Sequence, residues 1–90
     1  MNKAEIVARI ARESGLTKVD AGRALDAFLD NVTRTLKKGD KVTLVGFGTF
    51  VVARRKARTG RHPQSGIPIK IPGRRVARFV PGKDLKETVG

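Results

Sequence analysis

Lysine and arginine side chains dominate one stretch of this 90-residue chain, residues 54–78, which reads RRKARTGRHPQSGIPIKIPGRRVAR. No aspartate or glutamate occurs between Asp40 and Asp84. Guanidinium and ammonium groups bind phosphate oxygens, and so much like charge disfavours a compact fold unless a polyanion neutralises it. We therefore expect this stretch to bind a nucleic acid. Its basic side chains are Arg54, Arg55, Lys56, Arg58, Arg61, Lys70, Arg74, Arg75 and Arg78.

Residues suited to catalysis are scarce. The chain has one histidine and no cysteine, and residues 41–83 contain no carboxylate. A nuclease would need metal-binding carboxylates beside its basic groove. Gly46 and Gly48 lack the further glycine and the lysine of a nucleotide-binding loop. The sequence predicts that the protein is not an enzyme and has no metal or other cofactor.

The length of the chain limits the core that it can bury. If about twenty of its residues form a basic arm, about seventy remain, which is marginal for a lone monomer without disulfides. We therefore expect a homodimer. The formal net charge is +12, and residues 41–83 carry eleven basic and no acidic side chains. No stretch has transmembrane length, and the first twenty residues are too charged for a signal peptide, so we expect a cytoplasmic protein and no membrane partner.

Capping signals and helical periodicity predict two helices in the first 39 residues. Asn2 and Glu5 have the spacing of a capping box, and apolar residues recur at helical period up to Gly15. Thr17 and Asp20 repeat the signal at the start of a longer helix, which closes at 37–39. The apolar stripe of this helix is wider than the first helix can cover, which again favours a partner subunit. To the dimer core we assign Phe28, Leu29, Val32 and Leu36, together with Leu44 of the first strand.

The hydrophobic period changes from 3.6 to 2 after Asp40, which indicates strands. Val42 and Leu44 mark a first strand, and residues 46–48 turn the chain into a second strand that runs toward Arg58. Residues 59–66 are rich in turn formers and form the tip of an arm, from which a return strand leads back. Within a single domain, 1–90, we expect a helical dimerisation part at 1–39, a sheet at 40–58 and 73–80, a DNA-binding arm at 54–75, and a C-terminal helix at 83–89.

Three residues at the predicted tip bear on how DNA would be bound. Pro63 has two interpretations: loop prolines usually shape a turn, but a rigid ring at the end of a basic arm can also insert between base pairs and kink the duplex. His62 can add a pH-dependent phosphate contact, although a lone exposed histidine is more often inert. Gln64 is the one amide of the arm, so base-edge readout is weak. We expect a preference for bent, nicked or flexible double-stranded DNA.

Several motifs resemble the signature of the HU/IHF family of bacterial histone-like DNA-binding proteins, and HU in particular. They are GFGTF at 46–50, RRKAR at 54–58, TGRHPQSG at 59–66 and IKIP at 69–72. MNKAEIV at 1–7, GDKVTLVGFGTF at 39–50 and PGKDLK at 81–86 are similar to the family's flanks, so the resemblance covers the whole chain. The chain departs from residues common in the family at His62, Ser65, Pro68 and Ala77.

The resemblance implies an α+β fold: two N-terminal helices, a three-stranded antiparallel sheet with a long protruding β-ribbon arm, and a short C-terminal helix, in an intertwined dimer. It also implies an architectural, nucleoid-associated protein that bends, wraps and compacts double-stranded DNA through the minor groove. Pro63 would intercalate. Arg55, Arg58, Arg61 and Lys70 would contact DNA from the arm, and Lys3, Lys83 and Lys86 would hold flanking DNA against the body. Phe47, Phe50 and Phe79 match the family's aromatic core at the dimer interface.

Two alternative functions remain open. The first is an RNA-binding or ribosome-associated basic protein, because phosphate contacts do not distinguish RNA from DNA and binding to structured RNA is compatible with the composition. GFGTFV is similar to an RNA-recognition element, but Phe47 and Phe50 are three residues apart and would fall on opposite faces of a strand. The second alternative is a site-specific DNA bender similar to IHF.

Overall fold

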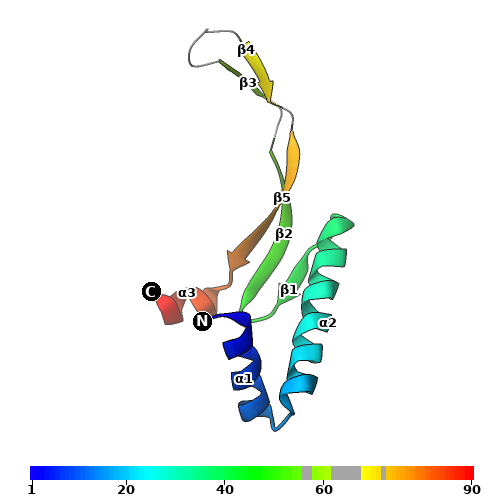
Figure 1. Ribbon diagram of the computed structural model, residues 1–90. Helices are drawn as coiled ribbons and strands as arrows, with labels where there is room; N and C mark the ends of the chain where they lie inside the picture. The colour runs from blue at the N-terminus through cyan, green and yellow to red at the C-terminus, as the bar shows by residue number, and fades with distance from the viewer. Residues whose placement is uncertain (56–57, 62–67, 72) are drawn as a thin grey trace. The chain divides into compact units, whose positions relative to one another are not determined.

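Helices precede strands along this chain, and a short helix follows the last strand (Figure 1). The computed structural model describes residues 1–55, 58–61, 68–71 and 73–90, with the backbone alone for 58–61 and 68–71. The elements are α1 (Lys3–Ser14), α2 (Lys18–Lys37), β1 (Val42–Leu44), β2 (Gly48–Arg55), β3 (Arg58–Arg61), β4 (Pro68–Ile71), β5 (Arg74–Pro81) and α3 (Lys83–Val89). They divide into two compact units, residues 1–34 and 35–90, so the last turn of α2 belongs to the second unit.

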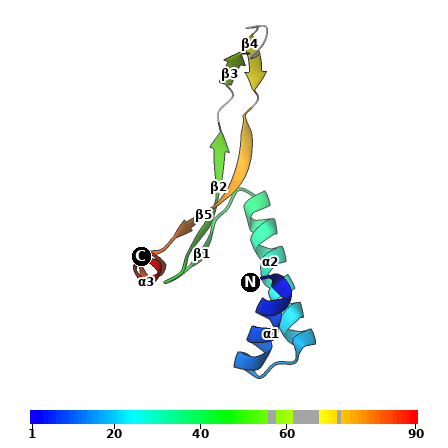
Figure 2. The same cartoon turned by 60° about the vertical axis from the view of Figure 1, so that its left-hand side comes forward.

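Side-chain caps set the helix ends in the first unit. The carboxamide oxygen of Asn2 accepts a hydrogen bond from the backbone N–H of Glu5 at 3.0 Å, as the sequence predicts. Gly15 ends α1 with a φ of 78°, a left-handed conformation that favours glycine. Thr17 Oγ1 accepts from the N–H of Asp20 at 3.1 Å at the start of α2. The two helices form a hairpin, which can be followed in Figure 2.

The end of α2 is closed by its own backbone. Gly39 has a φ of 88°. Its N–H donates to the Leu36 carbonyl at 2.9 Å, and the N–H of Asp40 donates to the Thr35 carbonyl at 3.1 Å. This pair of bonds is a Schellman motif, which satisfies carbonyls that the helix itself leaves without partners. The predicted end of the second helix is therefore confirmed.

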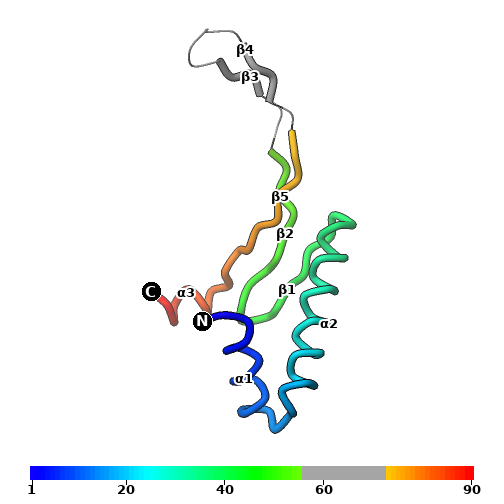
Figure 3. The backbone as a smooth tube through the Cα atoms, viewed as in Figure 1, coloured from blue at the N-terminus to red at the C-terminus, as the bar shows by residue number. Residues whose placement is uncertain are grey.

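The second unit contains a three-stranded antiparallel sheet in the order β1-β2-β5. A tight turn joins β1 to β2: the N–H of Phe47 donates to the Leu44 carbonyl at 2.9 Å, and Gly46 has a φ of 83°. The chain path through this turn is clear in the tube drawing (Figure 3). After β5, the N–H of Gly82 donates to the Phe47 carbonyl at 2.8 Å, so α3 begins beside the turn.

A second ladder, β3-β4, continues the register of β2 and β5. Arg55 pairs with Arg74 at the end of the first ladder, and three residues further along each strand Arg58 pairs with Ile71. The second ladder therefore keeps the register of the first. Strands pair within the predicted arm, as the sequence indicates. Residues 56–57, 62–67 and 72 lie outside the described part of the chain.

Few side chains are buried. Among the described residues, the buried apolar ones are Ala11 and Ala21, and no large side chain is fully buried. Phe79 packs between Phe47 and Phe50, with ring centroids 5.4 and 5.0 Å away. These rings form an aromatic cluster in the second unit, and their place at a dimer interface stays a prediction. Their packing is nevertheless open to solvent, since Phe47 remains 46% and Phe79 38% exposed.

Candidate nucleic-acid interface

Four arginines meet at the end of the β2-β5 ladder. Arg54 lies directly opposite Arg75, and Arg55 directly opposite Arg74. All four residues are exposed. Like charges in directly opposed positions destabilise a ladder, so this arrangement is unfavourable for the isolated fold and favourable for binding an anion.

The strand alternation divides these arginines between two faces. Directly paired residues share a face and neighbours along a strand do not. Arg54 and Arg75 therefore lie on the face of Phe50 and Phe79. The opposite face carries Arg55, Arg74 and Arg78. On that face the pair Ala53 and Val76 separates Arg78 from the pair Arg55 and Arg74.

A pocket of about 510 Å³ lies at the same place, lined by residues 53–55 of β2 and 76–78 of β5. Its lining combines the small apolar residues Ala53 and Val76 with basic ones. Small side chains allow a backbone or a sugar to approach the sheet closely, while the neighbouring guanidinium groups can bind phosphates. The pocket has the chemistry of a nucleic-acid contact surface.

One arginine differs from the others in its contacts. Arg75 Nη2 donates to the backbone carbonyls of Leu36 at 3.0 Å and Lys37 at 3.1 Å, in the last turn of α2. No sequence signal indicated this contact, because 38 residues separate Arg75 from Lys37. Across the described residues, no hydrogen bond or ion pair engages the side chains of Arg54, Arg55, Arg74 and Arg78.

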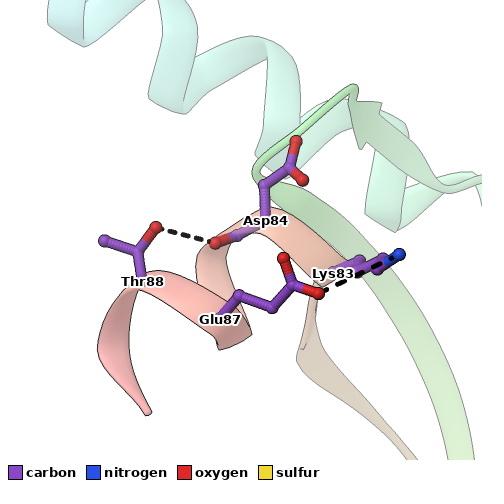
Figure 4. A network of polar contacts seen from close by, with 4 residues as sticks. All are labelled: Lys83, Asp84, Glu87 and Thr88. Atoms are coloured by element: carbon purple, nitrogen blue, oxygen red, sulfur yellow. Dashed lines mark hydrogen bonds and ion pairs between the residues drawn. The ribbon is translucent and has the colours of Figure 1, made fainter.

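The three lysines predicted to hold flanking DNA have different surroundings. Lys3 Nζ lies 2.6 Å from Asp26 Oδ1, a partner that sequence reasoning missed. Lys83 Nζ lies 3.9 Å from Glu87 Oε1 within α3 (Figure 4). Lys86 makes no ion pair with any described residue. Both pairs are exposed, and such pairs contribute only about 0–1 kcal/mol, so a phosphate can compete with either carboxylate.

Several predicted DNA contacts cannot be placed on this surface. Lys56, His62, Pro63 and Gln64 lie outside the described residues, and their roles stay predictions. Arg58, Arg61 and Lys70 are located by backbone alone, in the β3-β4 ladder. The described residues include no group of three or more His, Cys, Asp or Glu able to hold a metal ion. Nor does the described part include a helix long and apolar enough to cross a membrane.

Fold and surface together define a small basic protein that presents arginines on a two-stranded ribbon. The whole chain, residues 1–90, matches the family described as bacterial DNA-binding protein, and the chain belongs to this family. It is 52% identical over 89 residues to DNA-binding protein HU of Geobacillus stearothermophilus and 54% identical over 89 residues to HU-beta of Pseudomonas aeruginosa, in each case over 99% of both chains. The resemblance inferred from the motifs is confirmed.

Solved structures of the same family share the fold. An Anabaena HU–DNA cocrystal structure has a TM-score of 0.90 at 43% identity, covering 100% of this chain and 98% of that one. HU from Thermotoga maritima has a TM-score of 0.73 at 37% identity, with full coverage of both chains. The expected α+β architecture is therefore confirmed at the level of the single chain.

Proposed function

We propose that this protein is an architectural DNA-binding protein that bends and compacts double-stranded DNA with little sequence specificity. The observation that carries the proposal is the arginine-bearing end of the β2-β5 ladder in a chain of the bacterial DNA-binding family. The continuous register into β3-β4 supports a ribbon that can enter a groove of the duplex. A relative of high structural similarity was crystallised with DNA.

The proposed mechanism separates phosphate contacts from the wedge. Arg55, Arg74 and Arg78 neutralise phosphates at the root of the ribbon, and Arg58, Arg61 and Lys70 do so further along it. Lys3, Lys83 and Lys86 hold the flanking duplex. Pro63 inserts between base pairs at the tip and fixes a kink, a role that rests on the family resemblance. Asymmetric neutralisation and the kink together bend the DNA.

We further propose that the working form is a homodimer associated with the nucleoid in the cytoplasm. Exposed apolar side chains support a partner subunit: Phe28 is 37%, Leu29 44% and Val80 47% exposed in the single chain. A second copy would cover such residues and supply the core that one chain lacks. Two copies would also provide two ribbons, which a clamp on the duplex requires.

Salt dependence of binding tests the proposed function. With about six to ten phosphate contacts, affinity for a 30-base-pair duplex should fall about a thousandfold or more between 50 and 200 mM salt. Fluorescence anisotropy on duplexes of several sequences measures both this slope and the specificity. A hairpin RNA of the same length is the competing ligand. A shallow slope would contradict the proposed phosphate contacts, and tighter binding to the RNA than to every duplex would favour the RNA-binding alternative.

A further inference from the structure

Arg75 occupies the root of the ribbon but directs its guanidinium group toward a helix. Its Nη2 atom contacts two consecutive carbonyls, those of Leu36 at 3.0 Å and Lys37 at 3.1 Å. Both carbonyls lie in the last turn of α2, and that turn and β5 belong to the same unit. The contact therefore joins the strand that leads into the ribbon to the end of a helix.

The last turn of α2 has a backbone carbonyl that the Schellman motif leaves without a donor. The Schellman bonds occupy the Thr35 and Leu36 carbonyls, but they do not reach the carbonyl of Lys37. Arg75 donates to that carbonyl and adds a second bond to Leu36. A cation at a helix C-terminus also interacts favourably with the helix dipole. The positive charge of Arg75 thus has a partner within the protein.

Arg74, the preceding residue, provides a natural comparison. Its side chain lies on the opposite face of the ladder, directly across from Arg55. Both residues are exposed arginines in the same strand, but no hydrogen bond or ion pair within the described residues engages the side chain of Arg74. The two positions therefore carry the same charge at the same end of the sheet and differ in what the charge contacts.

We propose that Arg75 is a positioning residue: it anchors the root of the ribbon to the last turn of α2 and fixes the direction in which the ribbon leaves the sheet. It does not act as a phosphate contact. This inference rests on the proposed DNA-bending function. A bend is maintained only if the ribbon is held at a fixed angle against the strain of the bent duplex, so a loosened root lets the DNA relax while the phosphate contacts persist.

The experiment compares wild type with Arg75→Gln and its matched control Arg74→Gln in three measurements. The first is the slope of log affinity against log salt concentration for a 30-base-pair duplex. The second is end-to-end FRET of the same duplex at saturating protein, which reports bending independently of affinity. The third is hydrogen exchange of the Gly39 and Asp40 amides without DNA, because both amides donate into the turn that Arg75 contacts.

We expect Arg75→Gln to keep the wild-type salt slope and to lower FRET at saturation. Hydrogen exchange of both amides should become several-fold faster. Arg74→Gln should reduce the slope by about 1.8, the value for one lost phosphate contact in each of two protomers, lower FRET less than Arg75→Gln does, and leave exchange unchanged. A reduced slope with normal bending in Arg75→Gln would make Arg75 a phosphate contact. Faster exchange with normal bending would make it only a helix cap. Either result overturns the proposal.

Two further observations keep the test decisive. If wild type itself fails to bend the duplex, the proposed function fails and Arg75 has no bend to position, even where the exchange data support the anchor. If Arg75→Gln does not fold, NMR of the arginine side chains in wild type replaces it. DNA should then shift the Nε–H signal of Arg74 and leave that of Arg75 nearly unchanged, and equal shifts would overturn the proposal.

Discussion

Individual arginines at the ribbon root differ in their contacts although their side chains are chemically identical. The sequence predicted all of them as DNA contacts, because charge is visible in a sequence. It could not show that Arg75 contacts the carbonyls of Leu36 and Lys37, since this depends on where a distant helix ends. The Lys3–Asp26 ion pair was missed for the same reason. Residue types predicted the basic surface. Only the folded structure shows which of its basic side chains make contacts within the protein.

Gly48 provides a prediction about packing at the residue scale. A Cβ atom added there would meet the Phe79 ring and would lie 2.7 Å from the Val80 carbonyl oxygen, which backbone pairing holds in place. We expect Gly48→Ala to lower the free energy of unfolding by about 1–3 kcal/mol through overpacking. Urea denaturation at a fixed protein concentration measures the change.

Gly22 offers a matched control for that substitution. A Cβ atom at this position in α2 would meet only Val7 Cγ1, at an ordinary 3.8 Å. Since alanine favours a helix interior over glycine, Gly22→Ala should stabilise the protein by about 0.5–1 kcal/mol. Equal effects of the two substitutions would show that Phe79 and the Val80 carbonyl do not constrain Gly48.

At the scale of elements, the start of α2 depends on one side chain. Thr17 Oγ1 accepts the N–H of Asp20, which the helix itself cannot satisfy. Thr17→Ala should therefore reduce the free energy of unfolding by about 1 kcal/mol. Thr33 provides the control, because its Oγ1 donates to the Leu29 carbonyl of the same helix at 2.8 Å. Thr33→Ala removes no cap, and an equal loss in both variants would contradict the assignment.

Helix limits and strand limits were both largely predictable from the sequence. The caps at Asn2 and Thr17 and the glycines after α1 and α2 are local signals, and the structure uses each of them. The second strand was predicted to run from the turn at 46–48 toward Arg58; β2 is Gly48–Arg55, and β3 begins at Arg58. The last part of the sheet was predicted at 73–80, and β5 is Arg74–Pro81. The ladder extends through Arg74 and Arg75 because backbone pairing does not require apolar side chains.

At the scale of the whole molecule, the single chain lacks a sufficient core. Among the described residues no large side chain is fully buried, and Phe28 and Phe79 remain more than a third exposed. The wide apolar stripe of α2 predicted this shortage from the sequence. The residues that the sequence analysis assigned to the dimer core stay a prediction, because an interface depends on the shapes of two folded chains.

Concentration dependence tests the proposed dimer. If folding and association are coupled, the thermal midpoint should rise with protein concentration over the micromolar range. Sedimentation equilibrium should give twice the chain mass of 9.8 kDa. A constant midpoint together with a mass of 9.8 kDa would contradict the proposed homodimer.

DNA bending is the central claim, and ring closure tests it most directly. A duplex of about 100 base pairs is shorter than the persistence length of about 150 base pairs, so closure requires a bend from the protein. At matched occupancy, wild type should promote closure, and Pro63→Ala should bind but close the ring poorly. If neither protein promotes closure at full occupancy, the ribbon is only a basic clamp, and the architectural function is wrong.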